Sequence, residues 1–97
     1  MTCTVLLELH LKEECVDQIK AGFKGMFPDT RAYDGCIDIY ATQDQDTPTT
    51  IIAVEKWETR QHYEKYLAWR EERGDLDAVG EMLSEPPSIR YFDHLDA

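Results

Sequence analysis

The stretch from residue 2 to residue 27, TCTVLLELHLKEECVDQIKAGFKGMF, changes its hydrophobic period part of the way along. Over residues 2–11 apolar side chains occupy alternate positions, which is typical of a strand with one apolar face. Over residues 13–27 they recur every three or four positions, the period of an amphipathic helix. We expect this helix to end at Pro28 and Asp29, because proline interrupts the backbone hydrogen-bond ladder. The stretch therefore predicts a strand followed by a helix.

Working outward, the rest of the chain adds three more alternating segments and two helical ones. The strands are expected at 36–42, 50–58 and 88–95, with a polar loop at 43–49; one helix follows an N-cap at Thr59, and a short one starts at Asp75. This β-α-β-β-α-(α)-β order is typical of the ferredoxin-like split βαβ sandwich. We therefore predict one α+β domain over residues 1–97, with a four-stranded antiparallel sheet and helices on one face.

The second face of the predicted sheet is also rich in apolar side chains. Helices of the same chain can cover only one face, and a large apolar patch left in water is unusual. The simplest cover is the same face of a second copy, which predicts a two-fold homodimer; scattered surface apolar residues are the alternative. The positions concerned are Leu6, Cys36, Tyr40, Ile52, Val54 and Phe92.

Charge and hydropathy exclude several classes of partner. Ten Lys plus Arg against twenty Asp plus Glu give a net charge of −10, so the chain lacks the basic surface that binds nucleic acid or an anionic membrane. No apolar run is longer than four residues, which is far too short to span a bilayer. The opening Met1-Thr2-Cys3-Thr4 has no basic region ahead of an apolar stretch, so we expect a cytoplasmic protein.

No motif for a metal or a cofactor is visible. The three cysteines form no C-x-x-C pair, and neither H-x-H nor H-E-x-x-H spacing occurs among the histidines. The five glycines are scattered, so there is no glycine-rich loop for a nucleotide or flavin. We expect no disulfide, no metal and no cofactor. The residues concerned are Cys3, Cys15, Cys36, His10, His62 and His94.

Three short motifs together resemble the antibiotic biosynthesis monooxygenase (ABM) family. They are Thr30-Arg31-x-x-x-Gly35-Cys36, Glu55-x-Trp57-Glu58-Thr59, and Pro86-Pro87 before the last strand. The resemblance implies a ferredoxin-like dimeric α+β barrel. The family includes cofactor-independent oxygenases of polyketide quinone precursors, haem-degrading enzymes and isomerases of small signalling sugars, so it does not settle the reaction.

The resemblance implies site residues on the third strand and the helix after it. The family's oxygenases place a Trp at the position of Trp57, where an indole N–H can orient a substrate oxygen; an ordinary core anchor is the alternative. Many members carry a His at the position of Tyr66, so an imidazole base or haem ligand is missing there. Tyr66 could still donate a proton, and His62, one turn earlier, is a possible substitute base.

Haem degradation is disfavoured twice, by Tyr66 and by the lack of any Asn, which the haem-degrading members use on the first strand. A flat substrate would suit a pocket with aromatic walls, although the same side chains would also serve as core. We expect a cavity of about 300 Å³ or more beside Trp57 if the chain binds a ligand. The expected walls are Phe23, Phe27, Tyr63 and Trp69.

Glu55 shares a strand face with Trp57. If that face looks into a cavity, burial would raise the pKa of Glu55 and make it a candidate general base. A buried carboxylate without a partner is costly, so we favour a structural ion pair between Arg31 and Glu55.

The main hypothesis is a dimeric, cofactor-free monooxygenase of a small aromatic or quinol-type substrate, with Trp57, Tyr66 and His62 as catalytic candidates. An isomerase or binding protein of the same fold is the first alternative. A non-catalytic dimer module with a filled core is the second.

Overall fold

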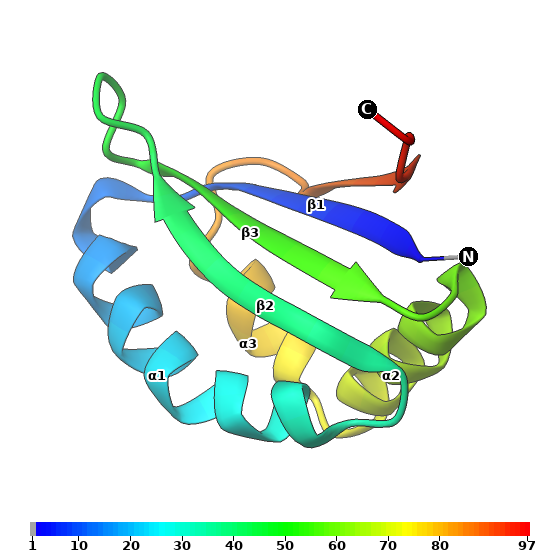
Figure 1. Ribbon diagram of the computed structural model, residues 1–97. Coiled ribbons are helices and arrows are strands. Elements are labelled where there is room, and N and C mark those ends of the chain that lie inside the picture. Colours follow the sequence, from blue (N-terminus) through cyan, green and yellow to red (C-terminus); the bar gives the residue numbers. More distant parts are fainter. Residues whose placement is uncertain (1) are drawn as a thin grey trace.

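A computed structural model describes residues 2–97 of the chain; Met1, with which the expected domain begins, lies outside them. Its helices and strands follow the predicted order (Figure 1). They are β1 (Cys3–His10), a 3-10 turn (Glu13–Cys15), α1 (Val16–Ala32), β2 (Cys36–Gln43), β3 (Thr50–Trp57), α2 (Arg60–Glu72), α3 (Asp75–Gly80) and β4 (Ser88–Asp93).

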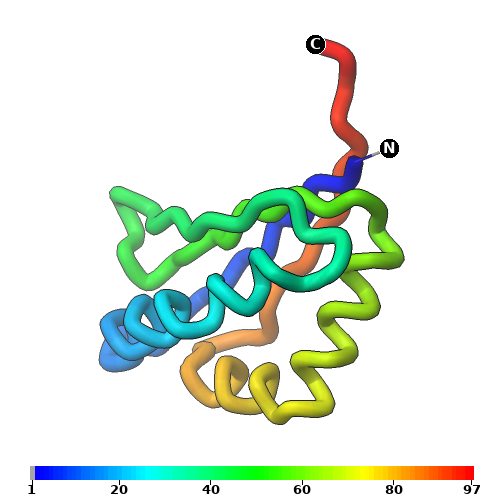
Figure 2. The backbone as a smooth tube through the Cα atoms, turned by 60° about the horizontal axis from the view of Figure 1, so that its bottom comes forward, coloured from blue at the N-terminus to red at the C-terminus, as the bar shows by residue number. Residues whose placement is uncertain are grey.

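The four strands form one antiparallel sheet in the order β2-β3-β1-β4. Because β3 lies between β1 and β2, the β1-α1-β2 unit is split, as the order of elements predicted. All three helices lie on the same side of the sheet (Figures 1 and 2). The α+β ferredoxin-like fold is therefore confirmed.

The core between sheet and helices has two parts. The first lies against α1 and α3, and the second joins the other end of β1 and β3 to α2. Strand β3 belongs to both, because alternate residues from Ile51 to Trp57 are buried. The buried members of the first part are Leu9, Leu11, Ile19, Phe23, Phe27, Ile39, Ile51, Ala53 and Leu83, and those of the second are Cys3, Val5, Trp57, Tyr63 and Tyr66.

The predicted end of the first helix at Pro28 was wrong. Helix α1 contains Pro28 and continues to Ala32. Proline removes only one backbone donor, and tertiary contacts hold the turn that follows it. Thr30 is fully buried with its Oγ1 2.7 Å from the Tyr66 hydroxyl, and Arg31 Nη2 donates to the Ile39 carbonyl at 3.0 Å.

A β-bulge at the start of β2 changes which side chains face the core. Simple alternation placed Ile37 on the core side and Cys36 on the outer face. Instead Cys36 pairs with Trp57 and packs against the core, whereas Ile37 is 49% exposed. The extra residue between Cys36 and Asp38 shifts the register by one, so the side chain before the bulge reverses its face.

The outer face of the sheet carries the apolar residues expected there, with the exception of Cys36. Phe92 is 41% exposed and Tyr40 50%, while Leu6, Ile52 and Val54 are half-buried. Within residues 2–97 no helix covers this face (Figure 2). Among the helices described, none has the length and apolar character needed to cross a membrane.

Candidate active site

Glu55 is a buried carboxyl group in the middle of the core. Its position on β3 points it toward the helices, and it is only 3% exposed. Its side-chain hydrogen bond comes from the Trp57 indole, whose Nε1 donates to Oε1 at 3.2 Å. Burial raises the pKa of Glu55 to about 7, although the bond from Trp57 opposes the rise. Glu55 is therefore poised to exchange a proton near neutral pH.

Glu55 lines a cavity of about 190 Å³ between the sheet and the three helices. Most of the walls are aliphatic or aromatic, and the ionisable groups beside Glu55 are Tyr63, Tyr66 and Arg70. The cavity is smaller than the 300 Å³ expected for a ligand site, and Trp57 does not line it. The other walls include Leu7, Leu9, Phe23, Met26, Phe27, Ile39, Leu67, Leu76, Val79, Leu83, Pro87 and Ile89.

The hydroxyl of Tyr66 is fully engaged with its neighbours. Thr30 Oγ1 donates to the Met26 carbonyl at 3.2 Å, so the phenol, 2.7 Å away, donates to Thr30. Arg70 Nε in turn donates to the phenol at 2.9 Å. Burial raises the pKa of Tyr66, and its hydrogen bonds with Thr30 and Arg70 offset only part of this rise. This network makes Tyr66 a fixed part of the wall.

Arg70 connects α2 to its surroundings and was not predicted as a site residue. It is 2% exposed, and its guanidinium donates to Asp75 and to the Met26 carbonyl, both at 2.9 Å, as well as to Tyr66. The signal was present in the sequence, because Arg70 lies on the apolar stripe of α2 with Tyr63 and Tyr66. An arginine on such a stripe needs buried partners.

Tyr63 differs from Tyr66 in having an unengaged hydroxyl. It is 1% exposed and lines the cavity, and its hydroxyl makes no hydrogen bond to the chain over residues 2–97. Burial raises its pKa, and the negative charge of Glu55 adds to the effect, so the phenol stays protonated.

The structure brings only some of the predicted site residues together. Phe23, Phe27, Tyr63 and Tyr66 line the cavity with Glu55. His62 and Trp69 do not line it, and the indole N–H of Trp57 binds Glu55. His62 lies at the start of α2, where its Nδ1 is 2.6 Å from Thr59 Oγ1.

The expected ion pair between Arg31 and Glu55 is not formed. Arg31 donates to the Ile39 carbonyl at the edge of the sheet, and its guanidinium lies 5.7 Å from the centre of the Phe27 ring. Two roles were considered for Glu55, an ion pair with Arg31 and a carboxyl that faces a cavity. The structure has the second arrangement.

The cysteines offer no activated thiol at this site. All three are free, and burial raises the pKa of Cys36 to about 11, with the charges of Glu55 and Asp38 adding to the effect. A thiol with such a pKa stays protonated at neutral pH and is a poor nucleophile.

A second hollow, of about 520 Å³, lies outside the core between α1 and β2. Phe23, Phe27 and Ile51 form its apolar floor, and Lys20, Lys24 and Arg31 lie around it. Three of the ten cationic side chains of a chain with a net charge of −10 thus gather at one groove.

The fold and this core define an α+β protein of the ferredoxin-like class with a small internal cavity. The family model for antibiotic biosynthesis monooxygenases matches residues 2–71, which include β1, β2, β3 and the cavity-lining part of α2. The chain belongs to this family.

Solved structures extend the similarity to α3 and β4. The chain is similar to a conserved protein from Methanosarcina mazei Go1, with a TM-score of 0.86, 18% identity, and 95% of this chain and 91% of that chain covered. It is similar to Rv0793 from Mycobacterium tuberculosis, with a TM-score of 0.86, 20% identity, and 100% and 98% covered. A structure described as an antibiotic biosynthesis monooxygenase has a TM-score of 0.85, 16% identity, and 96% and 98% covered. At these identities the structures support the fold alone. None of the curated proteins matches the chain.

Proposed function

We propose that this protein is a cofactor-free monooxygenase of a small aromatic or quinol-type substrate, with Glu55 as the general base. One observation carries the proposal: a 3% exposed carboxyl with a pKa raised to about 7 faces an apolar cavity. A base with a pKa near the working pH combines a deprotonated fraction with a useful driving force for proton transfer. Membership of the ABM family supports the choice of reaction class.

The proposed reaction starts when Glu55 removes an acidic proton from a substrate CH₂ group, which a quinol presents in its keto tautomer. The resulting carbanion transfers electrons to dioxygen, and a carbon–oxygen bond forms to give a peroxide anion, which takes the proton back from Glu55. Loss of the second C–H proton breaks the O–O bond, leaving a C=O group and one water. The substrate is oxidised and dioxygen is reduced, so no other reductant is needed. An apolar cavity favours this sequence because it keeps bulk water away from the anion.

The size of the cavity limits the substrate. Ligand pockets usually measure about 300 to 1,000 Å³, and this cavity measures about 190 Å³. We therefore propose a single-ring substrate in place of a multi-ring polyketide.

For several predicted site residues, the geometry supports a role that differs from the one expected from the sequence. In this proposal Trp57 holds the Glu55 carboxyl in place through its hydrogen bond, and the hydroxyl of Tyr63, a residue that lines the cavity, donates to a substrate oxygen. Tyr66 serves as a wall, because Thr30 and Arg70 use its hydroxyl. His62 has no part in this proposal, because it does not line the cavity.

We also propose that the protein is a homodimer through the outer face of the sheet and acts in the cytoplasm. Partly exposed Phe92 and Tyr40, next to half-buried Leu6, Ile52 and Val54, support the dimer. Such a face resembles the apolar inner surfaces of two packed sheets.

Oxygen consumption tests the enzymatic proposal directly. Single-ring quinols and a three-ring anthrone are compared, with the rate of autoxidation without protein subtracted. We expect uptake with the small substrates, a loss of at least about a hundredfold in Glu55→Gln, and no change in Glu71→Gln, whose side chain is exposed. Oxygen uptake that persists in Glu55→Gln would show that Glu55 is not the general base.

A second candidate function is the binding of a small anionic aromatic ligand without turnover. The groove between α1 and β2 favours it, because Lys20, Lys24 and Arg31 surround an apolar floor. Saturable binding of an aromatic carboxylate that is weakened in Lys24→Gln, with no oxygen uptake, would favour this function over the oxygenase.

A further inference from the structure

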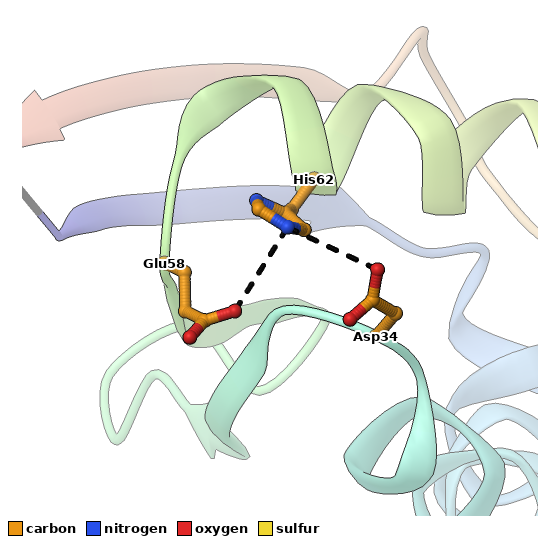
Figure 3. Close-up of side chains that lie close together, drawn as sticks. All are labelled: Asp34, Glu58 and His62. Atoms are coloured by element: carbon orange, nitrogen blue, oxygen red, sulfur yellow. Dashed lines mark ion pairs between the residues drawn. The ribbon is translucent and has the colours of Figure 1, made fainter.

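Three potential metal ligands meet on the surface, away from the cavity. Asp34 lies in the turn between α1 and β2, Glu58 directly follows β3, and His62 lies in the first turn of α2. Figure 3 shows the imidazole of His62 between the two carboxylates. One ligand atom from each residue lies within 4.8 Å of the other two. Segments from three parts of the chain thus place a nitrogen and two oxygen donors together.

The two distances from His62 Nε2 are compatible with a shared cation, and the two carboxylate oxygens lie within 4.8 Å of each other. His62 Nε2 is 3.9 Å from Asp34 Oδ2 and 3.8 Å from Glu58 Oε2. Two donors that each lie about 2.1 Å from one metal ion can be at most about 4.2 Å apart. The carboxylates are exposed, with 75% of the Asp34 and 60% of the Glu58 side chain accessible, so they can rotate inward to complete the site.

The imidazole is held in place, whereas the carboxylates are free to adjust. Thr59 Oγ1 accepts the His62 backbone N–H at 3.1 Å and lies 2.6 Å from Nδ1. A hydrogen bond at one ring nitrogen is what usually orients a metal-binding histidine. The ring also packs against Gly35, where a Cβ would overlap with it. The Nε2 atom is therefore directed at the two carboxylates.

His10 provides an internal comparison. It too lies near two carboxylates, but Glu8 contacts its Nε2 at 2.7 Å and Glu85 its Nδ1 at 3.6 Å. Its two carboxylates thus approach different ring nitrogens, and one cation cannot bind both of them together with a single nitrogen. Only the arrangement around His62 directs both carboxylates to the same nitrogen.

We propose that Asp34, Glu58 and His62 form a binding site for a divalent transition-metal ion such as Zn²⁺. One nitrogen and two carboxylate oxygens suit such an ion, and water can fill the remaining positions. A bound ion connects the turn before β2 to the start of α2 and stabilises the fold there. The site is independent of Glu55 and of the proposed oxygenase reaction, because none of its ligands lines the cavity.

Titration calorimetry with Zn²⁺ tests the proposal on the wild-type protein and three variants. We expect saturation at one ion per chain, a weakening of at least about tenfold in His62→Gln and in Asp34→Asn, and unchanged affinity in His10→Gln. Zn²⁺ should also raise the thermal midpoint of wild type and His10→Gln, but not that of the other two variants. Asp34 is mostly exposed, so Asp34→Asn keeps the test valid if His62→Gln folds poorly.

All three variants keep the cysteines, so binding to a thiol would survive in each of them. Saturable binding that persists in both His62→Gln and Asp34→Asn would overturn the proposal, and so would its loss in His10→Gln. A wild-type protein that shows no saturable Zn²⁺ binding would also overturn it.

Discussion

Replacing Glu55 with Gln should make the protein more stable at pH 8 and change its stability much less at pH 5. The carboxyl is 3% exposed, and its pKa is about 7 in the folded chain against an ordinary value of 4.5. Below pH 4.5 both states hold the proton. Between the two values the unfolded chain loses its proton while the folded chain keeps it, so the stability of the wild type falls as the pH rises.

The size of the effect follows from the two pKa values. Their difference corresponds to a loss of about 3 kcal/mol in the free energy of unfolding of the wild type, and this loss is fully present above pH 7. Gln has nearly the same shape, and its carbonyl oxygen can still accept the Trp57 N–H, but it cannot ionise. We therefore expect the free energy of unfolding of Glu55→Gln to exceed that of the wild type by about 2–3 kcal/mol at pH 8. This corresponds to a rise in thermal midpoint of about 10 °C.

Urea unfolding followed by tryptophan fluorescence at pH 5, 6, 7 and 8 measures this difference. Equal protein concentrations are needed, because association would add to the apparent stability. Glu71→Gln is the matched control, since it removes an exposed carboxyl and should change the free energy of unfolding only slightly. An offset between Glu55→Gln and the wild type that stays constant from pH 5 to 8 would refute the raised pKa, and with it the case for Glu55 as a base.

Three other predictions test separate parts of the structure. Trp57→Phe removes the 3.2 Å hydrogen bond that lowers the pKa of Glu55, so the pH midpoint of oxygen uptake should move upward; an unchanged midpoint would show that the bond has no such effect. Gly35→Ala places a Cβ at φ 89° against the His62 ring and should destabilise the protein by about 1–3 kcal/mol in urea, whereas Gly22→Ala in the open middle of α1 should be neutral or stabilising. Phe92→Glu puts a charge on the outer face of the sheet, so light scattering should give half the wild-type mass; equal masses would argue against the proposed interface.

The order of strands and helices could be predicted because hydrophobic period is a local property. Alternation identified β1 and β3, and the helical stripes of α1 and α2 were equally clear. The two errors lie where contacts between distant segments override the local rule. Buried Thr30 and the bond from Arg31 to Ile39 continue α1 past Pro28, and the bulge at Ile37 turns Cys36 toward the core.

Less of the candidate site than of the fold could be predicted from the sequence. Alternation on β3 correctly placed Glu55 and Trp57 on one face, and the sequence therefore determined that a carboxyl and an indole point the same way. It could not determine that Trp57 would bind Glu55, that Arg31 would bind the edge of the sheet, or that His62 would face Asp34 and Glu58.

Those outcomes depend on distances between side chains of different elements. Spacing along one strand or helix defines a direction, but the energy of a buried charge depends on every group that packs around it. For this protein the sequence determined the ferredoxin-like fold and the face of most strand and helix residues, with Cys36 and Ile37 as exceptions. Only the tertiary structure decided that Glu55 faces an apolar cavity with no cationic partner among residues 2–97, because its predicted partner, Arg31, is held at the edge of the sheet.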